Sequence, residues 1–348
     1  MFQVNTKRFS SVVTISTVAA LSAAPQASLA EEVNIYSYRQ EFLLRPLLDA
    51  FTAKTDIDVN VVYASKGLLE RIENEGRNTP ADILLTSDIA PLFDAKERNL
   101  LARIDSAEIS ANVPAQYRDE DGTWVGLTAR SRIIYTSKER VADGEISRYE
   151  DLTDPKWAER ICTRSGKHSY NLSLIGSLIE HVGEAEAEAW LAGVKANLAR
   201  KPQGNDRAQV KAIKEGQCDV ALGNSYYFGA MLTNEKEPEQ QEWADSVNLI
   251  FPNQADRGAH MNISGAGITA NAPNPKAALA LIEFLTSEEA QRIYAEVNYE
   301  FPVRPGVARS ALINEYMGEF KADDISLTRV AANRSAAAKM VDRVGFDN

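Results

Sequence analysis

The stretch "VNIYSYRQEFLLRPLLDAFTAKTDIDVNVVYA", residues 33–64, decides the fold class. It opens on a strand-like run, continues through residues 42–55, where apolar residues recur at every third or fourth position as in an amphipathic helix, and ends on a second strand-like run. The pattern then repeats as a helix at 67–76, a strand at 81–86 and a helix at 89–99. This β-α-β-α-β order predicts a parallel sheet with helices on its faces.

A second α/β region follows the first. Strand-like runs occupy residues 131–137, 159–165, 218–224, 247–252 and 262–269. Helical patterns occupy residues 170–182, 184–199, 206–216, 274–297 (as two helices meeting near Thr286) and the tail 327–344. We therefore predict a two-lobed α/β protein. Because ligands of open α/β sheets bind at the carboxyl ends of strands, a cleft between the lobes is the expected site.

The N-terminus has the features of a secretory signal peptide. Lys7 and Arg8 form a charged region, residues 12–24 form an apolar region, and "SLA" at 28–30 is a small-residue cleavage site. The apolar run is too short to span a bilayer, and no later run is long enough. We therefore predict cleavage before Glu31 and export to a bacterial periplasm.

The overall charge and the missing motifs exclude several classes of function. The chain has 348 residues and a formal net charge of −11, which disfavours nucleic acid and anionic membrane surfaces as partners. The sequence contains no nucleophile elbow, phosphate loop, dinucleotide fingerprint or His-Glu-x-x-His motif. An enzyme using a tyrosine or Lys167 as acid or base stays an alternative, but no paired carboxylate supports it. We predict a protein that is not an enzyme.

The two cysteines, Cys162 and Cys218, predict one disulfide, because an even pair in an oxidising compartment is normally bonded. Free thiols are the alternative. Two cysteines cannot form a structural zinc site alone, and His168, His181 and His260 show no ligand spacing with them.

Three tyrosines follow strand ends in the second region. Tyr226 and Tyr227 stand side by side after "GNS", and Tyr170 follows "RSGKHS". A single tyrosine usually packs its ring in a core and wets its hydroxyl. Three phenols at strand ends, clamped together by a Cys162–Cys218 disulfide, favour a common cleft instead.

Three phenols suit a hard, highly charged cation. Phenolate is an anionic oxygen donor, and a free tyrosine titrates near ~10, so only a strong Lewis acid displaces its proton at neutral pH. Ferric ion fits, and three phenolates match its charge. Arg39, Arg130 and Arg132 are candidates for holding an accompanying anion such as carbonate or a carboxylate, although ordinary ion pairs are the alternative for each arginine.

On these residues the chain resembles the bacterial periplasmic ferric-ion-binding proteins, which are the substrate-binding components of iron ABC importers. The resemblance covers essentially the whole chain after residue 30, and "GNSYYFG" is its most specific motif. The supporting segments are "NIYSYRQ", "GLLERI", "PADILLT", "ARSRIIY", "SGKHSYNLSLI", "QGNDRAQVKAI" and "HMNISGAGI".

The resemblance implies a type 2 periplasmic-binding fold with two mixed sheets, flanking helices and a hinged cleft. It implies that Tyr170, Tyr226 and Tyr227 bind Fe(III) and that a synergistic anion, often carbonate, completes the site. Arg39, Arg130 and Gln40 are then the anion-binding residues. Some relatives place a histidine, or a His-Tyr pair, where this chain has Gln40 and Glu41. The resemblance therefore implies a subgroup with three tyrosines plus an anion.

The corresponding domain prediction has a first lobe of residues 31–128 plus 256–304 and a second lobe of residues 129–255 plus 305–348. The expected protein is a monomer that delivers ferric ion to an inner-membrane ABC permease. The alternative is a protein of the same fold for another solute, such as a polyamine, an oxyanion or thiamine. A purely structural extracellular protein is disfavoured by the tyrosines at strand ends.

Overall fold

The computed structural model describes residues 1–3 and 31–348. The predicted signal peptide lies, apart from its first three residues, outside this described part. Within the described ranges no helix is both long and apolar enough to cross a membrane. Residues 31–348 pack as one unit, and the following paragraphs concern that unit.

Strands and helices alternate through the first part of this unit as the sequence predicts. The strands are β1 (Glu32–Ser37), β2 (Asp58–Tyr63), β3 (Ile83–Thr86), β4 (Val125–Ser137), β5 (Ile161–Cys162), β6 (Val220–Asn224), β7 (Val247–Ile250), β8 (Met261–Ile268) and β9 (Phe301–Pro302). The helices are α1 (Arg45–Thr55), α2 (Leu68–Glu75), α3 (Ile89–Glu97), α4 (Ala107–Asn112), α5 (Ser169–Val182), α6 (Glu184–Ala196), α7 (Asp206–Lys214), α8 (Tyr226–Leu232), α9 (Glu239–Asp245), α10 (Pro275–Leu285), α11 (Glu288–Asn298), α12 (Ala311–Met317), α13 (Leu327–Ala332) and α14 (Arg334–Val344).

The strands form a continuous ladder in the order β2-β1-β3-β8-β4-β6-β5, with β7 and β9 also paired to β4. Strand β1 runs parallel to β2 and β3, and β6 runs parallel to β5. Strand β8 is antiparallel to both β3 and β4. The predicted mixed α/β architecture is confirmed, with antiparallel strands added to the parallel core.

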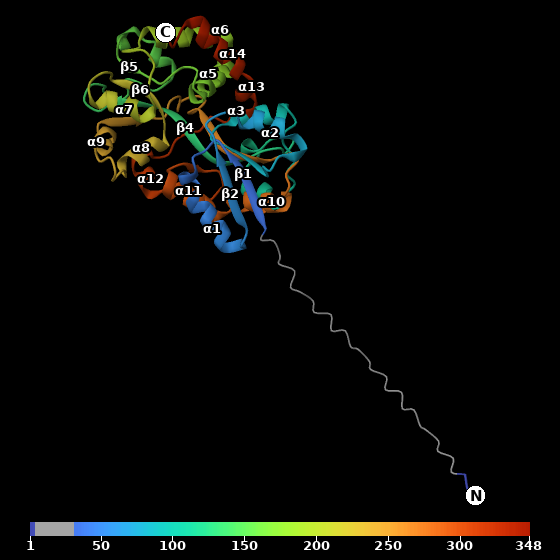
Figure 1. Ribbon diagram of the computed structural model, residues 1–348. Coiled ribbons are helices and arrows are strands. Elements are labelled where there is room, and N and C mark those ends of the chain that lie inside the picture. Colours follow the sequence, from blue (N-terminus) through green and yellow to red (C-terminus); the bar gives the residue numbers. More distant parts are fainter. Residues whose placement is uncertain (4–30) are drawn as a thin grey trace. The chain divides into compact units, whose positions relative to one another are not determined.

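The ladder consists of two sheets, and the long strand β4 takes part in both of them. Residues from Val125 to Ser131 pair with β8, whereas residues from Arg132 to Thr136 pair with β6. The partner therefore changes between Ser131 and Arg132, in the middle of one unbroken strand (Figure 1). This crossover places Arg130 and Arg132 at the junction of the sheets.

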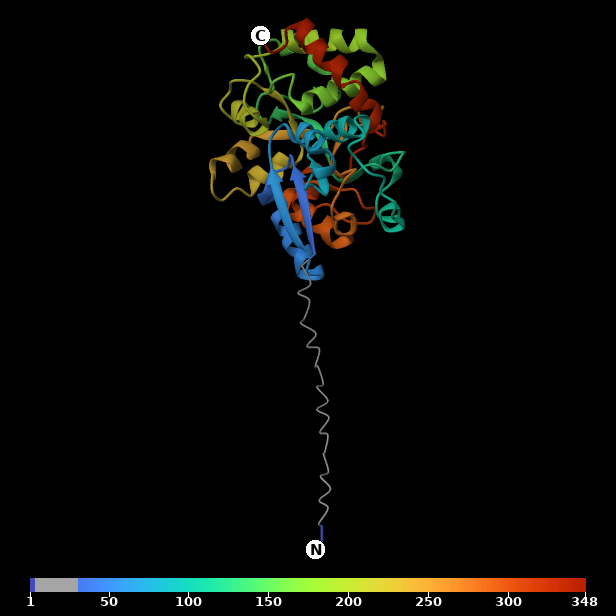
Figure 2. The same cartoon turned by 45° about the vertical axis from the view of Figure 1, so that its right-hand side comes forward.

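Helices cover both ends of this ladder. Helices α1, α10 and α11 contact one another, and α10 contacts β1. At the opposite end, α14 packs against α5 and α6, an arrangement visible in both views (Figure 1, Figure 2). A separate hydrophobic core, which includes Trp157, Leu174, Trp190 and Met340, lies under these last helices. Each end of the ladder thus has its own apolar packing.

The predicted strand at 159–165 is shorter than expected. Only Ile161–Cys162 pair with β6. The next residue, Thr163, bonds outside the sheet: its carbonyl accepts from the Gln203 N–H at 3.2 Å, and its hydroxyl accepts from the Asn171 amide at 3.2 Å. These bonds draw the chain into the loop that leads to α5.

The predicted single C-terminal helix is two helices that meet at Asn333. The Asn333 amide donates to the Gly176 carbonyl at 3.3 Å and to Glu180 Oε2 at 3.1 Å, both on α5. This side chain fixes the junction of α13 and α14 against α5. The helical pattern of residues 327–344 did not indicate this break, because the break depends on contacts between Asn333 and α5, which are far apart in the sequence.

Candidate metal centre

Tyr170 is the second residue of α5. The helix is preceded by His168, whose Nδ1 accepts a hydrogen bond from the Tyr170 N–H at 3.3 Å. Burial, with the nearby Arg164 charge, lowers the pKa of His168 to about 3, so the imidazole is neutral and can serve as this acceptor. The capping bond fixes the backbone from which the Tyr170 phenol projects.

Tyr226 and Tyr227 are the first two residues of α8, directly after β6 and Ser225. The Ser225 N–H donates to the Ser131 carbonyl at 2.9 Å, and the Ser131 N–H donates to Ser225 Oγ at 3.2 Å. This reciprocal pair anchors the strand-to-helix turn on β4. The two phenol rings lie with centroids 4.3 Å apart at the carboxyl end of β6.

The three predicted phenols converge. The hydroxyl oxygens of Tyr170 and Tyr226 are 3.2 Å apart. This separation is close to the about 3 Å expected between neighbouring oxygen ligands of a small octahedral cation with bonds of 2.0–2.1 Å. Burial, followed by the neighbouring phenols, raises the pKa of Tyr226 well above its usual value, and burial also raises the pKa of Tyr227. Both therefore carry protons at neutral pH.

All six residues predicted for the site line one cavity of about 800 Å³. They are Tyr170, Tyr226, Tyr227, Arg39, Arg130 and Gln40. The residues come from segments that are far apart in the sequence, and both ends of the sheet ladder contribute to the lining. Charged, polar and phenolic groups surround the cavity.

Arg130 is buried at the junction of the sheets. Its Nη2 donates to the Ser87 carbonyl and lies 3.7 Å from Asp88 Oδ2. Its Nη1 has no hydrogen-bond partner within the described residues, although it is shielded from solvent. The guanidinium carbon lies 5.5 Å from the centroid of the Tyr170 ring. Arg130 therefore offers an unused donor beside the phenols.

Arg39 has both Nη groups occupied, while its Nε has no hydrogen-bond partner within the described residues. Its Nη1 donates to Glu300 Oε1 at 3.0 Å and its Nη2 donates to Glu300 Oε2 at 2.7 Å, while Ser264 Oγ lies 2.9 Å from Nη1. The carboxylate of Glu300 thus takes both ends of the guanidinium fork. Gln40 is exposed in the cavity wall. Glu41 pairs with Arg45 and is not among the lining residues.

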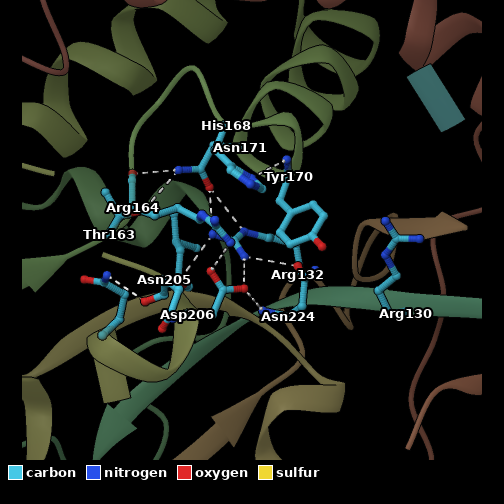
Figure 3. Close-up of polar contacts among 12 residues, drawn as sticks. Arg130, Arg132, Thr163, Arg164, His168, Tyr170, Asn171, Asn205, Asp206 and Asn224 are labelled. Atoms are coloured by element: carbon cyan, nitrogen blue, oxygen red, sulfur yellow. Dashed lines mark hydrogen bonds and ion pairs between the residues drawn. The ribbon is translucent and has the colours of Figure 1, made fainter. Parts of the chain in front are cut away.

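Arg132 has a different environment from Arg130. Its guanidinium donates to Asp206 Oδ2 at 2.7 Å, to Asn171 Oδ1 at 2.8 Å and to Asn224 Oδ1 at 3.0 Å. Asn171 is adjacent to Tyr170, and Asn224 lies two residues before Tyr226. Arg132 therefore ties together the two segments that carry the phenols (Figure 3).

Asp206, the first residue of α7, completes this network. It accepts from the Asn224 N–H at 2.9 Å and from Arg164 Nη1 at 3.2 Å, in addition to Arg132. Burial would raise the pKa of Asp206, but the Arg132 and Arg164 charges outweigh burial and hold the pKa below its usual value. In the view of Figure 3, Arg132 and Arg164 lie on one side of the Tyr170 ring and Arg130 on the other.

Side chains of the usual metal-binding types do not cluster elsewhere. Within residues 1–3 and 31–348, no group of three or more histidine, cysteine, aspartate or glutamate residues is placed to hold a metal ion. His181 pairs with Asp323, and His260 contacts Ser173.

The predicted disulfide is confirmed. Cys162 and Cys218 are bonded, and they are 56 positions apart in the sequence. The bond links β5, which leads to the Tyr170 loop, to the residues that enter β6, which leads to Tyr226. It thus joins the two strands whose carboxyl ends carry the phenols.

Replacing both cysteines by alanine is expected to lower the free energy of unfolding by about 2–4 kcal/mol, because the bond restricts the unfolded chain over this separation. Urea unfolding of the apoprotein measures the effect, and wild-type protein treated with a reductant is the matched comparison. A double variant that unfolds at the wild-type urea concentration would contradict the expectation.

Several residues of the cavity were not predicted. Tyr38 directly follows β1 and Tyr63 is the last residue of β2, and both line the cavity. The rule that identified Tyr170, a tyrosine at a strand end, applies equally to them. Glu300 had no such signal, because its role depends on Arg39, which lies 261 positions away.

Comparison with known proteins agrees with this geometry. The family model for bacterial extracellular solute-binding proteins matches residues 78–326. The chain belongs to this family. This solute-binding protein is 41% identical to iron uptake protein A1 of Synechocystis, over 97% of this chain and 95% of that protein.

Two solved structures extend the comparison. The apo ferric ion-binding protein A of Pasteurella haemolytica is 48% identical, with a TM-score of 0.87 over 92% of this chain and 99% of that one. The Trichodesmium protein IdiA (FutA), solved in complex with iron and citrate, is 41% identical, with a TM-score of 0.86 over 90% of this chain and 99% of that one. The two-lobed fold and the resemblance to ferric-binding proteins are both confirmed.

Proposed function

We propose that this solute-binding protein binds Fe(III) in the periplasm through Tyr170, Tyr226 and Tyr227 and delivers it to an inner-membrane ABC permease for iron uptake. The observation that carries the proposal is the convergence of three phenols in one cavity, with two hydroxyl oxygens 3.2 Å apart. The iron-related names of the relatives support the same cargo.

The chemistry of the cavity suits ferric ion. Three phenolates neutralise the charge of Fe(III), and an oxygen donor is the preferred ligand of a hard cation. A synergistic oxyanion such as carbonate completes the site. Arg130 offers it the unused Nη1, and Gln40 and Arg39 lie in the same wall. Reduction to Fe(II) weakens binding, because the lower charge holds phenolates less strongly.

Closure of two lobes around this cavity is part of the proposal. The lobes are residues 31–128 plus 256–304 and residues 129–255 plus 305–348, with the shared strand β4 as one of the connections. Closure would exclude water and bring the first-lobe residues to the ion. The protein acts as a monomeric carrier and not as an enzyme, and residues 1–30 direct its export.

Adding Fe(III) to chelator-stripped protein is expected to produce an orange-red colour from tyrosinate-to-iron charge transfer, with one iron bound per chain. Metal analysis and visible absorption test this directly. If the protein stays colourless and metal-free but binds a polyamine, thiamine or an oxyanion alone, then that solute, and not iron, is its ligand.

Iron binding is also expected to release about three protons, one for each phenol, because the raised pKa values of Tyr226 and Tyr227 keep these groups protonated at neutral pH. The ferric affinity should therefore fall as the pH falls, by up to about 1000-fold per unit if all three protons leave. Proton release in weakly buffered solution measures the number. Binding without proton release would exclude phenolate ligands.

A further inference from the structure

Tyr38 is held in an unusual position between helix α2 and the cleft. It directly follows β1, and its N–H donates to the Leu85 carbonyl at 2.9 Å. Its phenol oxygen accepts hydrogen bonds from the N–H groups of Leu68 at 3.1 Å and Leu69 at 3.2 Å, in the first turn of α2. The residue at the cap position of α2 is Gly67, which has no side chain to satisfy these donors. Tyr38 therefore caps the helix from outside.

These two bonds determine what the phenol can still do. A tyrosine hydroxyl has one hydrogen to donate and two acceptor positions. Both acceptor positions face the N–H groups of Leu68 and Leu69, so the hydroxyl hydrogen is directed away from α2. In the part of the chain that the structure describes, no group is recorded as accepting it. Tyr38 is thus a donor whose orientation is already fixed.

The space beside this residue includes the cleft. Tyr38 lines the 800 Å³ cavity that contains the three phenols, and also an adjoining cavity of about 890 Å³. Tyr63, Ser87, His168 and Tyr170 line both cavities as well, so the two spaces meet around Tyr170. Tyr38 is therefore part of the wall around any ligand that binds between the lobes.

We propose that Tyr38 is a specificity-determining hydrogen-bond donor to an oxyanion of the carbonate or carboxylate class that is bound together with iron. The proposal rests on the proposed ferric function. It assigns the first lobe a role in recognising the anion.

Two further observations favour an oxyanion over the metal as the partner of Tyr38. A metal ion would have to displace one of the helix N–H groups from the phenol oxygen, whereas an anion accepts the hydrogen that is already free. In addition, burial raises the pKa of Tyr38, more than the two N–H bonds lower it, so the hydroxyl keeps its hydrogen. Arg130, which lines the same cavity and whose buried Nη1 has no partner within the described residues, supplies the positive charge that an anion requires.

The environment of the neighbouring Arg39 increases the importance of the Tyr38 hydroxyl for anion binding. Arg39 follows Tyr38 in the chain, but both ends of its guanidinium are engaged by Glu300. An incoming anion must compete with that carboxylate for the two Nη groups, which leaves Nε as the one unpaired donor of Arg39 within the described residues. The Tyr38 hydroxyl requires no such exchange, and it therefore provides a first-lobe contact at lower cost.

The test compares Tyr38→Phe with Tyr36→Phe. Tyr36 is on the same strand, but its hydroxyl donates to Glu75 at 2.8 Å and it lines neither cavity. Ferric affinity is measured by chelator competition with and without bicarbonate, and again with citrate. Wild type and Tyr36→Phe should bind iron more tightly with the anion. Tyr38→Phe should lose about tenfold of that enhancement, as expected for one hydrogen bond to a charged group, and should keep its charge-transfer colour.

Three other outcomes overturn the proposal. An unchanged anion enhancement in Tyr38→Phe shows that the hydroxyl does not contact the anion. A loss of charge-transfer intensity shows that Tyr38 is a ligand of iron itself. Wild-type protein that binds iron equally well with and without both anions shows that no oxyanion takes part. A wild-type protein that binds no iron under any condition refutes the ferric function, which is a separate result. Melting temperatures of both variants verify that they are folded.

Discussion

Replacing Tyr226 and Tyr227 together by phenylalanine is expected to abolish the orange-red colour and to lower the ferric affinity by about 10³-fold or more. As a scale, the four ligands of a structural zinc site in zinc-finger peptides contribute about 10–16 kcal/mol, which corresponds to roughly 3 kcal/mol for each ligand. Removing two phenol oxygens removes two anionic ligands. The remaining Tyr170 cannot neutralise a trivalent ion alone.

The fold should survive this double substitution. The rings of Tyr226 and Tyr227 pack against each other with centroids 4.3 Å apart, and phenylalanine keeps both rings. Tyr299→Phe is the matched control, because Tyr299 lines the same cavity while its hydroxyl bonds to Thr233 Oγ1 at 3.0 Å. Chelator competition and visible absorption give the two readouts. A double variant that retains wild-type colour and affinity would exclude these residues as ligands.

The sequence was informative where local pattern and final structure coincide. The alternation of residues 33–99 predicted three strands and three helices, and all six are present. Five of them bury apolar side chains, whereas β2 only half-buries Val59 and Val61 against the core. The phenols were also predictable, since Tyr170 and Tyr226 each follow a strand, and the carboxyl ends of neighbouring strands meet at one edge. Their convergence required only that β5 and β6 be adjacent, as the structure has them.

The partners of the arginines could not be predicted in this way. Residue type and position offered Arg39, Arg130 and Arg132 as candidates for holding an anion, and the resemblance then favoured Arg39 and Arg130. The structure separates them: Glu300 takes both Nη groups of Arg39 and leaves its Nε unpaired, Arg130 has an unpaired Nη1, and Arg132 is enclosed by polar side chains. These differences depend on residues between 39 and 261 positions away, and no local pattern carries that information.

Because Arg132 is enclosed by polar partners, its replacement is the second substitution from which we expect a large effect. Arg132→Met is expected to lower the free energy of unfolding of the apoprotein by about 3–5 kcal/mol, because it leaves the fully buried carboxylate of Asp206 with Arg164 as its remaining cation. Urea unfolding measures the loss. Arg148→Met is the control, since Arg148 forms ion pairs at the surface and should cost about 1 kcal/mol or less. Equal losses in the two variants would contradict a structural role for Arg132.

A double variant should distinguish the effect of Arg132 on stability from its effect on iron binding. Replacing Arg132 by methionine and Asp206 by leucine removes both buried charges, and such apolar replacements are often neutral or stabilising. We expect Arg132→Met/Asp206→Leu to recover much of the lost stability but not the ferric affinity, which should stay about tenfold or more below wild type. The reason is geometric: Arg132 bonds Asn171 beside Tyr170 and Asn224 just before Tyr226, and an apolar pair cannot hold those two segments in register. Full recovery of affinity together with stability would show that the phenols are positioned without this network.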